Sequence, residues 1–169
     1  SIAINKEVRA ADAAIVTIGR QAGEGADRDI DTEFYLIDTE RQLLTEVCKA
    51  FHAAHKPVIV IINSGSVIET ASWRDLPDAI ICAWQPGEEG GNSLADILTG
   101  KVNPSGRLTM TWPIAATDHP STEGYADKVA TKHHEDIYVG YRYFDTFNKE
   151  VAYPFGYGLS YTHFEFSKP

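Results

Sequence analysis

The chain has 169 residues, of which 43% are hydrophobic, and a formal net charge of −9 at pH 7. This length and apolar content predict one globular domain, or a large part of one, with a substantial core. The acidic balance, without a cluster of Lys and Arg, excludes a nucleic-acid partner. No apolar run approaches the roughly 20 residues that span a bilayer, so no membrane span is expected.

The first predicted element is a strand over Ala13–Gly19, and a glycine-rich loop at residues 23–28 follows it. Glycine tolerates backbone angles that other residues avoid, so this loop can turn sharply and present Glu24 beyond the strand, where open α/β sheets carry their sites. Charged neighbours can adjust the proton affinity of Glu24, and they are Arg20, Asp27, Arg28 and Asp29. The residues alone leave two interpretations open, a site-bearing carboxylate or a solvated turn with surface ion pairs.

Two later apolar runs, Val58–Asn63 and Ala79–Trp84, are continuous rather than alternating. Such runs are typical of strands buried on both faces of a parallel sheet. Between the first two strands the pattern predicts a helix, with a capping box at Thr39 and Gln42. Its apolar face comprises Leu43, Leu44, Val47, Cys48 and Phe51. With a second helix predicted over residues 92–98, the alternation indicates an α/β layered sandwich, with a mainly parallel sheet flanked by helices.

The second half of the chain has a different character. Gly100 is suited to end the second helix in a left-handed conformation, and a turn is predicted at residues 103–106. A short strand over 107–112 and a long surface loop over 113–136 are expected next. The final segment, 138–166, is dense in Tyr, Phe and Gly. It is interpreted as an aromatic-rich closing strand and extended tail, with a sugar-stacking platform as the alternative.

Other motifs give weaker indications of chemistry. Cys48 and Cys82 form no disulfide or metal pattern and are interpreted as buried, reduced thiols. The run at 133–136 offers four adjacent ligand types, but its spacing fits no common zinc motif, so no metal is expected. Gly19–Gly25 lacks the dinucleotide and phosphate-loop fingerprints. Ser64 follows a strand without the flanking glycines of a nucleophile elbow and is interpreted as a turn residue.

Taken together, these segments resemble the C-terminal α/β sandwich domain of glycoside hydrolase family 3, the family of β-glucosidases and β-xylosidases. The segments run in the family's order over nearly the whole chain. They are Gly19-Arg20, Gly23–Arg28, Val60–Ser66, Ala83–Asn92, Asn103–Leu108, Val139–Asp145 and Pro154–Thr162. The final one, with the sequence Phe-Gly-Tyr-Gly-Leu-Ser-Tyr at 155–161, is especially characteristic of the family.

The resemblance implies a catalytic role for Glu24. Family members hydrolyse terminal β-linked sugars with retention, using an aspartate nucleophile from a barrel domain and an acid/base glutamate from the sandwich domain. Glu24 stands where the family has that glutamate, and Asp27 and Arg28 would be supporting residues that hold the loop. The chain contains no barrel, so it is expected to be part of a larger β-glucosidase and to be inactive alone. No cofactor or metal is implied.

The implied partners are β-linked glucosides or oligosaccharides and the N-terminal barrel domain of the parent chain. Two alternatives stay open: a β-xylosidase, and a noncatalytic carbohydrate-binding or scaffold module. A module that has lost its catalytic role has no reason to keep a carboxylate at Glu24, which favours catalysis. The family habit favours a periplasmic or secreted parent, but the residues leave the compartment open. The chain is expected to form one domain over residues 1–169, itself part of a complete sandwich.

Overall fold

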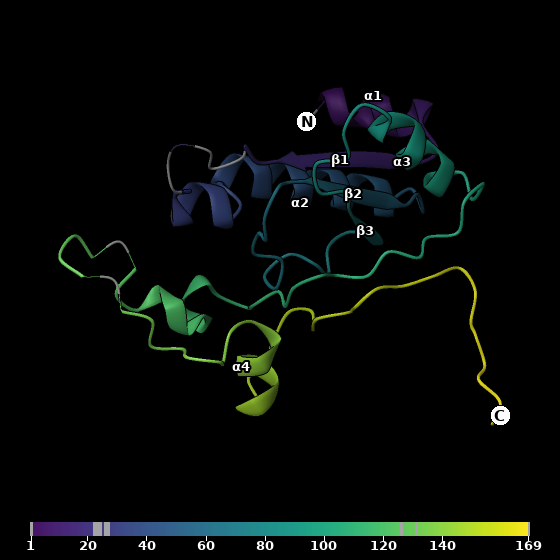
Figure 1. Cartoon of the computed structure of the whole chain (residues 1–169). Helices are drawn as coiled ribbons and strands as arrows, with labels where there is room; N and C mark the ends of the chain where they lie inside the picture. The colour runs from purple at the N-terminus through teal and green to yellow at the C-terminus, as the bar shows by residue number, and fades with distance from the viewer. Residues whose placement is uncertain (1, 22–24, 26–27, 126, 131, 169) are drawn as a thin grey trace. The chain divides into compact units, whose positions relative to one another are not determined.

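The computed structural model describes residues 2–21, 25, 28–125, 127–130 and 132–168. The chain divides into two compact units, Ser1–Pro86 and Gly87–Pro169. The first contains a sheet and two α-helices, and the second contains two further α-helices joined by irregular chain (Figure 1). The prediction that residues 1–169 form one domain stays a prediction.

The first unit is built on a parallel three-stranded sheet in the order β1-β2-β3. The strands are β1 (Ala14–Gly19), β2 (Val58–Asn63) and β3 (Ala79–Cys82). In the register, Ala14 pairs with Val58. The prediction of a parallel sheet built from these three runs is confirmed, and with it the α/β class.

Only the central strand is buried as the continuous apolar runs predicted. Val58 and Val60 on β2 are completely buried, and β2 has a paired strand on each side. On β1, by contrast, Ile15 is 55% exposed, so the expectation of burial on both faces is wrong for this strand. Among the described strands β1 pairs on one side only, which leaves its other edge without a neighbouring strand.

Helix α2 (Asp38–His52) joins β1 to β2 and packs against both strands. Leu44 on its inner face is 1% exposed, whereas Leu43, also assigned to that face, is 51% exposed. The expected capping box at Thr39 and Gln42 is wrong. The helix begins two residues earlier than that motif implies, and Glu40 accepts a hydrogen bond from the backbone N–H of the N-cap, Ile37, at 3.2 Å.

A further helix, α1 (Ile2–Ala10), had no counterpart among the predicted elements. It packs against α2. The Lys56 ammonium donates to the carbonyl oxygens of Val8 at 2.7 Å and Ala11 at 2.5 Å. A cation at the carboxyl end of a helix satisfies carbonyls that lack partners within the helix and opposes the negative end of its dipole.

Both cysteines are free thiols, as expected, but only Cys48 is buried, and Cys82 is half-buried. Burial nevertheless raises the pKa of the Cys82 thiol to about 11, so this group stays protonated at neutral pH. No helix in the described part of the chain is long and apolar enough to cross a membrane.

The second unit begins with α3 (Gly90–Leu98). Gly100 has a φ of 74°, which confirms that it follows the helix end in the left-handed conformation. The segment expected to be a long loop contains two single 3₁₀ turns, Ala116–Asp118 and Pro120–Thr122. Helix α4 (Tyr141–Thr146) occupies part of the region expected to be a closing strand, so that expectation is wrong.

The expected strand over 107–112 is also absent as a regular element. The backbone of this segment meets the later chain at an isolated antiparallel bridge between Trp112 and Tyr153, and by two bonds between Leu108 and residues 156 and 157. Pro154 lies between these contacts and has no N–H to extend a ladder. Trp112 and Phe144 form the core of this unit, at 2% and 1% exposed.

Candidate functional site

The loop that carries the predicted site residues follows β1. Glu24 and Asp27 lie outside the described residues, so the structure describes the loop by its two ends, Arg20 and Arg28, and by Gly25. Gly25 has a φ of 84°, with open space where a Cβ would be. The glycine is therefore required by the backbone conformation rather than by a close contact.

Arg20 extends the sheet by one residue past β1, since its N–H donates to the Asn63 carbonyl oxygen at 2.9 Å. Its side chain forms a bidentate pair with Glu40 on α2, with Nη1 to Oε1 at 2.7 Å and Nη2 to Oε2 at 2.8 Å. Nε also donates to the carbonyl oxygen of Glu33 at 2.9 Å. Arg20 thereby connects the end of β1 to the start of α2.

Arg28 stands at the other end of the loop. Its Nη1 donates to the Ser66 hydroxyl and to the Val67 carbonyl at 3.3 Å, and its Nη2 donates to the Glu33 carbonyl. Burial lowers the pKa of the guanidinium; Glu33 opposes this effect and Arg20 adds to it. These contacts tie Arg28 to the chain after β2 and to Glu33, and its supporting role in a reaction stays a prediction.

A short helical turn of π type, Ile30–Phe34, lies between the loop and α2. Asp29 caps it, since its Oδ1 accepts hydrogen bonds from the Thr32 N–H at 2.9 Å and hydroxyl at 2.8 Å. These bonds lower the pKa of the Asp29 carboxyl. Glu33 returns the contact by accepting the Asp29 N–H at 2.7 Å. The turn is thus closed on itself and supplies a fixed carbonyl to both arginines.

The loops after the other two strands lie at the same edge of the sheet. After β2, the Ser64 hydroxyl donates to the Ser66 carbonyl at 2.7 Å, which supports the interpretation of Ser64 as a turn residue. Gly65 faces the loop after β3, because a Cβ there would lie 3.1 Å from the Gln85 side chain. Loops from all three strands therefore gather at the carboxyl edge, where open α/β sheets bind their ligands.

Two residues of this arrangement were missed by the sequence analysis, Glu40 as the partner of Arg20 and Ser66 as the partner of Arg28. The separations of 20 and 38 residues give no local pattern that would pair them. The only available signal was that Arg20 and Ser66 belong to the segments that resemble the family.

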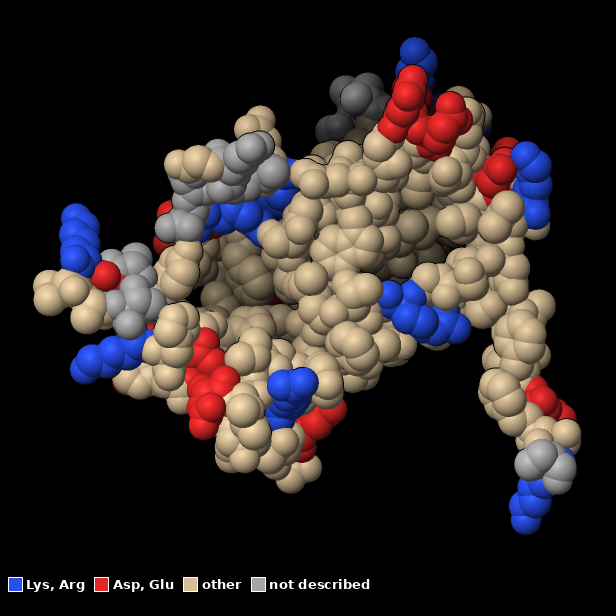
Figure 2. Space-filling model, in the orientation of Figure 1, with Lys and Arg blue, Asp and Glu red and all other residues tan. Residues whose placement is uncertain are grey.

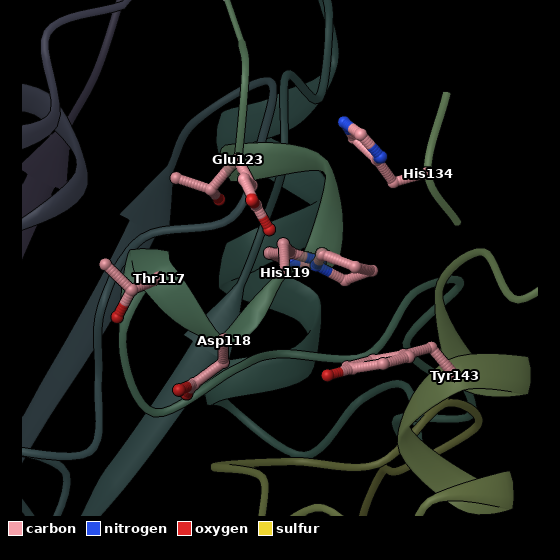
Figure 3. Close-up of a pocket in the computed structure, with 8 residues that line it drawn as sticks. Thr117, Asp118, His119, Glu123, His134 and Tyr143 are labelled. Atoms are coloured by element: carbon pink, nitrogen blue, oxygen red, sulfur yellow. The ribbon is translucent and has the colours of Figure 1, made fainter. Parts of the chain in front are cut away.

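The expectation that the run at 133–136 binds no metal stays a prediction. His133 Nδ1 lies 3.9 Å from Glu135 Oε1, and the described residues contain no group of three or more His, Cys, Asp or Glu side chains that could hold an ion. His134 instead lines a cavity of about 440 Å³ in the second unit (Figure 3).

The polar groups around this cavity mostly serve the backbone. Asp118 Oδ2 accepts the Ala115 N–H at 2.7 Å, and the Thr122 hydroxyl donates to the Ala116 carbonyl at 2.9 Å. Figure 3 shows Tyr143 projecting from α4 toward the cavity that it lines together with Asp118. The His119 ring packs edge-on against Phe144 at 5.3 Å. These contacts describe a packed corner of the unit rather than a set of groups aimed at a ligand.

On the face shown in Figure 2, Lys and Arg side chains occur in separate small groups, with neutral or acidic residues between the groups. Among the described residues on that face there is no continuous basic surface of the kind that binds a phosphate backbone.

The fold and the position of the loop define a parallel α/β domain with its candidate site at the carboxyl edge of the sheet. The chain belongs to the glycosyl hydrolase family 3 C-terminal domain family, whose profile matches residues 3–161.

Among solved structures, β-glucosidase 3B from Thermotoga neapolitana in complex with glucose is 49% identical, with a TM-score of 0.92, over 98% of this chain and 24% of that one. β-Glucosidase A of Butyrivibrio fibrisolvens is 42% identical over 91% of this chain and 22% of its own length. An exo-α-(1→6)-L-arabinopyranosidase of Bifidobacterium longum is 43% identical over 67% of this chain and 15% of its own. The chain thus spans less than a quarter of the length of these three relatives.

Proposed function

We propose that this chain is the acid/base-bearing part of a retaining β-glucosidase that hydrolyses terminal, non-reducing β-D-glucosyl residues, with Glu24 as the acid/base. The observation that carries the proposal is a glycine-flanked carboxylate after β1, in a chain 49% identical to a β-glucosidase solved with glucose. The loops after β2 and β3 lie at the carboxyl edge of the sheet, at the end where β1 leads into residues 20–28.

In a retaining hydrolysis two carboxyl groups stand about 5–5.5 Å apart across the scissile bond. Glu24 would donate its proton to the glycosidic oxygen as the first carboxyl group, while the nucleophile forms the glycosyl-enzyme. Glu24 would then take a proton from water as the intermediate is hydrolysed. The nucleophile would come from an N-terminal barrel domain of the parent protein, so the isolated chain would have no glycosidase activity.

Supporting roles are assigned to Asp27 and Arg28. The contacts of Arg28 with Ser66, Val67 and Glu33 tie the end of the loop to the chain that follows β2. Asp27 is adjacent to Arg28 in sequence and is proposed to support the same part of the loop. No metal or cofactor enters the proposed reaction, because proton transfer and nucleophilic attack by carboxylates suffice for it.

For the sugar, a β-xylosidase is the main alternative. Other sugars are also candidates, because the chain is similar to an arabinopyranosidase. The residues that select the sugar would lie mostly on the proposed barrel domain. A noncatalytic carbohydrate-binding module is the alternative from another class, and activity of the full-length protein discriminates it from an enzyme.

The test is Glu24→Gln in the full-length protein, which preserves size but removes proton transfer. General acid/base catalysis contributes about 10²–10⁴-fold, so hydrolysis of a substrate with a poor leaving group, such as cellobiose, should fall by that order. An aryl glucoside with a very acidic phenol needs little protonic assistance, so its glycosyl-enzyme should form and accumulate.

Azide needs no general base, so it should restore turnover and yield the β-glycosyl azide. The matched control is Glu7→Gln, an exposed carboxylate on α1, which should leave every rate unchanged. Equal losses for all leaving groups without azide rescue would show that Glu24 is structural.

A further inference from the structure

We propose that Arg20, paired with Glu40, is a positioning residue for Glu24, because it fixes the first end of the loop at the carbonyl oxygen to which Arg28 fixes the other end. The inference rests on the acid/base role proposed for Glu24. It concerns two side chains, Arg20 and Glu40, to which that proposal gives no part.

The Arg20 guanidinium is held in one orientation, because all of its donors are hydrogen-bonded. A guanidinium has five N–H donors, and in Arg20 each one has an acceptor. Besides the two Glu40 oxygens and the Glu33 carbonyl, these are the carbonyls of Gly19 at 2.7 Å and Tyr35 at 3.2 Å. The side chain is 6% exposed, so the bidentate pair is protected from much of the screening that weakens surface ion pairs.

Arg20 and Arg28 donate hydrogen bonds to the same carbonyl oxygen. A carbonyl oxygen can accept two hydrogen bonds, and the Glu33 oxygen accepts one from Arg20 Nε and one from Arg28 Nη2. Glu33 is held in turn, because its N–H donates to the Asp29 carbonyl at 3.0 Å. The side chains at the two ends of residues 20–28 are therefore bound to a single anchored atom.

Anchoring at both ends would restrict the position of a catalytic group between them. Fixing both ends of a short loop reduces the conformations open to its middle, and Glu24 lies at the middle of 20–28. Misplacement of a catalytic group by about 1 Å can cost about 10²-fold in rate. Arg20 and Glu40 would then act through Glu24 without contacting the substrate.

The contacts of Arg20 with Glu40 and Glu33 require an arginine side chain. Lysine keeps the positive charge, but its ammonium is a point donor that cannot bind both Glu40 oxygens and the Glu33 carbonyl in one plane. Arg20→Lys therefore tests geometry at constant charge. Glu40→Gln tests the same link from the other side, since it keeps the shape of the side chain and removes its charge.

The experiment measures kcat/KM of full-length Arg20→Lys and Glu40→Gln with two aryl glycosides of the sugar that the wild-type protein prefers. Phenol is the poor leaving group and 2,4-dinitrophenol the good one. We expect losses of about 10- to 100-fold for the phenyl glycoside, the scale of a misplaced proton donor, and less than about threefold for the dinitrophenyl glycoside. The ratio of the two rates does not depend on the fraction of folded enzyme.

The matched control is Arg41→Lys, since Arg41 is the next residue on α2 and its guanidinium donates to the Ser72 hydroxyl at 3.1 Å. It should leave the ratio unchanged. If Arg20 has a merely structural role, Arg20→Lys lowers both rates equally, and that result would overturn the inference. An unchanged ratio in both Arg20→Lys and Glu40→Gln would also overturn it.

Glu24→Gln measured beside these variants separates the two proposals. If Glu24→Gln changes the ratio and neither test variant does, only the positioning role fails. If Glu24→Gln itself leaves the ratio unchanged, the acid/base proposal fails, and the positioning role fails with it.

Discussion

The two units of the chain hold their backbones in different ways. In the first, β2 pairs with a strand on each side, and the side chains of Val58 and Val60 are completely buried. In the second, separate segments meet at a few backbone bonds and one isolated bridge, and Trp112 and Phe144 are buried. A regular sheet places loops at one edge, whereas irregular chain depends on individual side-chain and glycine contacts. The difference explains why the candidate site, at the sheet edge of the first unit, can be held by a few side-chain pairs.

If the first unit depends on a continuous core, truncating one inner side chain should have the largest effect. Leu44→Ala removes a side chain that is 1% exposed, and we expect a loss of about 2–5 kcal/mol. Leu43→Ala, on the adjacent exposed position of α2, should change stability by less than about 0.5 kcal/mol. Urea unfolding followed by tryptophan fluorescence measures both, and similar losses would contradict the assigned burial of α2.

If the second unit depends on individual close contacts, a single methyl group should disturb it. A Cβ on Gly158 would lie 2.6 Å from the Gly106 carbonyl oxygen and 2.7 Å from Arg107 Cδ. We expect Gly158→Ala to destabilise the unit by about 1–3 kcal/mol, the usual range for overpacking.

The matched substitution is Gly91→Ala in α3, where a Cβ meets nothing within 4 Å. It should stabilise by about 0.5–1 kcal/mol, because alanine has the higher helix propensity. Thermal unfolding measures the pair, and equal effects would argue against a close approach at Gly158.

Acid should distinguish the units by a smaller effect. Burial lowers the pKa of His119 below 6.5, although Asp118 opposes the shift. The pKa of Asp78 is lowered below 3.8, first by the Val58 N–H and then by His52. In both cases the unfolded chain binds the proton more readily, so the stabilisation is complete above the unfolded pKa and is lost as pH falls through the folded one.

The second unit should therefore begin to loosen below about pH 6.5, and the contacts of Asp78 in the first unit only below about pH 4. Hydrogen exchange of peptides from each unit, measured along a pH series and corrected for the intrinsic rate, tests this order. Replacing His119 with Gln should remove the first step and leave the second. Simultaneous loosening of both units would contradict the assignment.

Much of the first unit was predictable, because its signals are local. The apolar runs that became β1, β2 and β3 are contiguous in sequence, and α2 follows from the spacing of apolar residues on one helical face. The order of these elements favoured a parallel α/β sheet. The end of α3 was also predictable, since Gly100 can adopt a positive φ without strain.

The errors arose where local preference and packing disagree. Aromatic residues favour strands, so residues 138–166 were expected to close the sheet, yet Tyr141–Thr146 forms α4 with Phe144 buried. The Thr39 and Gln42 pair satisfied a capping pattern, but Glu40 provides the hydrogen bond to the N-cap, and Gln42 bonds to Glu46 instead. A local pattern gives several candidate partners, and the fold selects among them.

The sequence by itself determined the three strand segments, the main helix, the glycine loop and the resemblance to a family, since periodicity, turn chemistry and ordered motifs are written within short segments. Tertiary structure alone decided that Arg20 pairs with Glu40, that Arg28 reaches Ser66, and that both arginines donate to one carbonyl of Glu33. These pairs are distant in sequence, and a hydrogen bond requires donor and acceptor within about 3 Å. Only the folded sheet edge brings them to that distance.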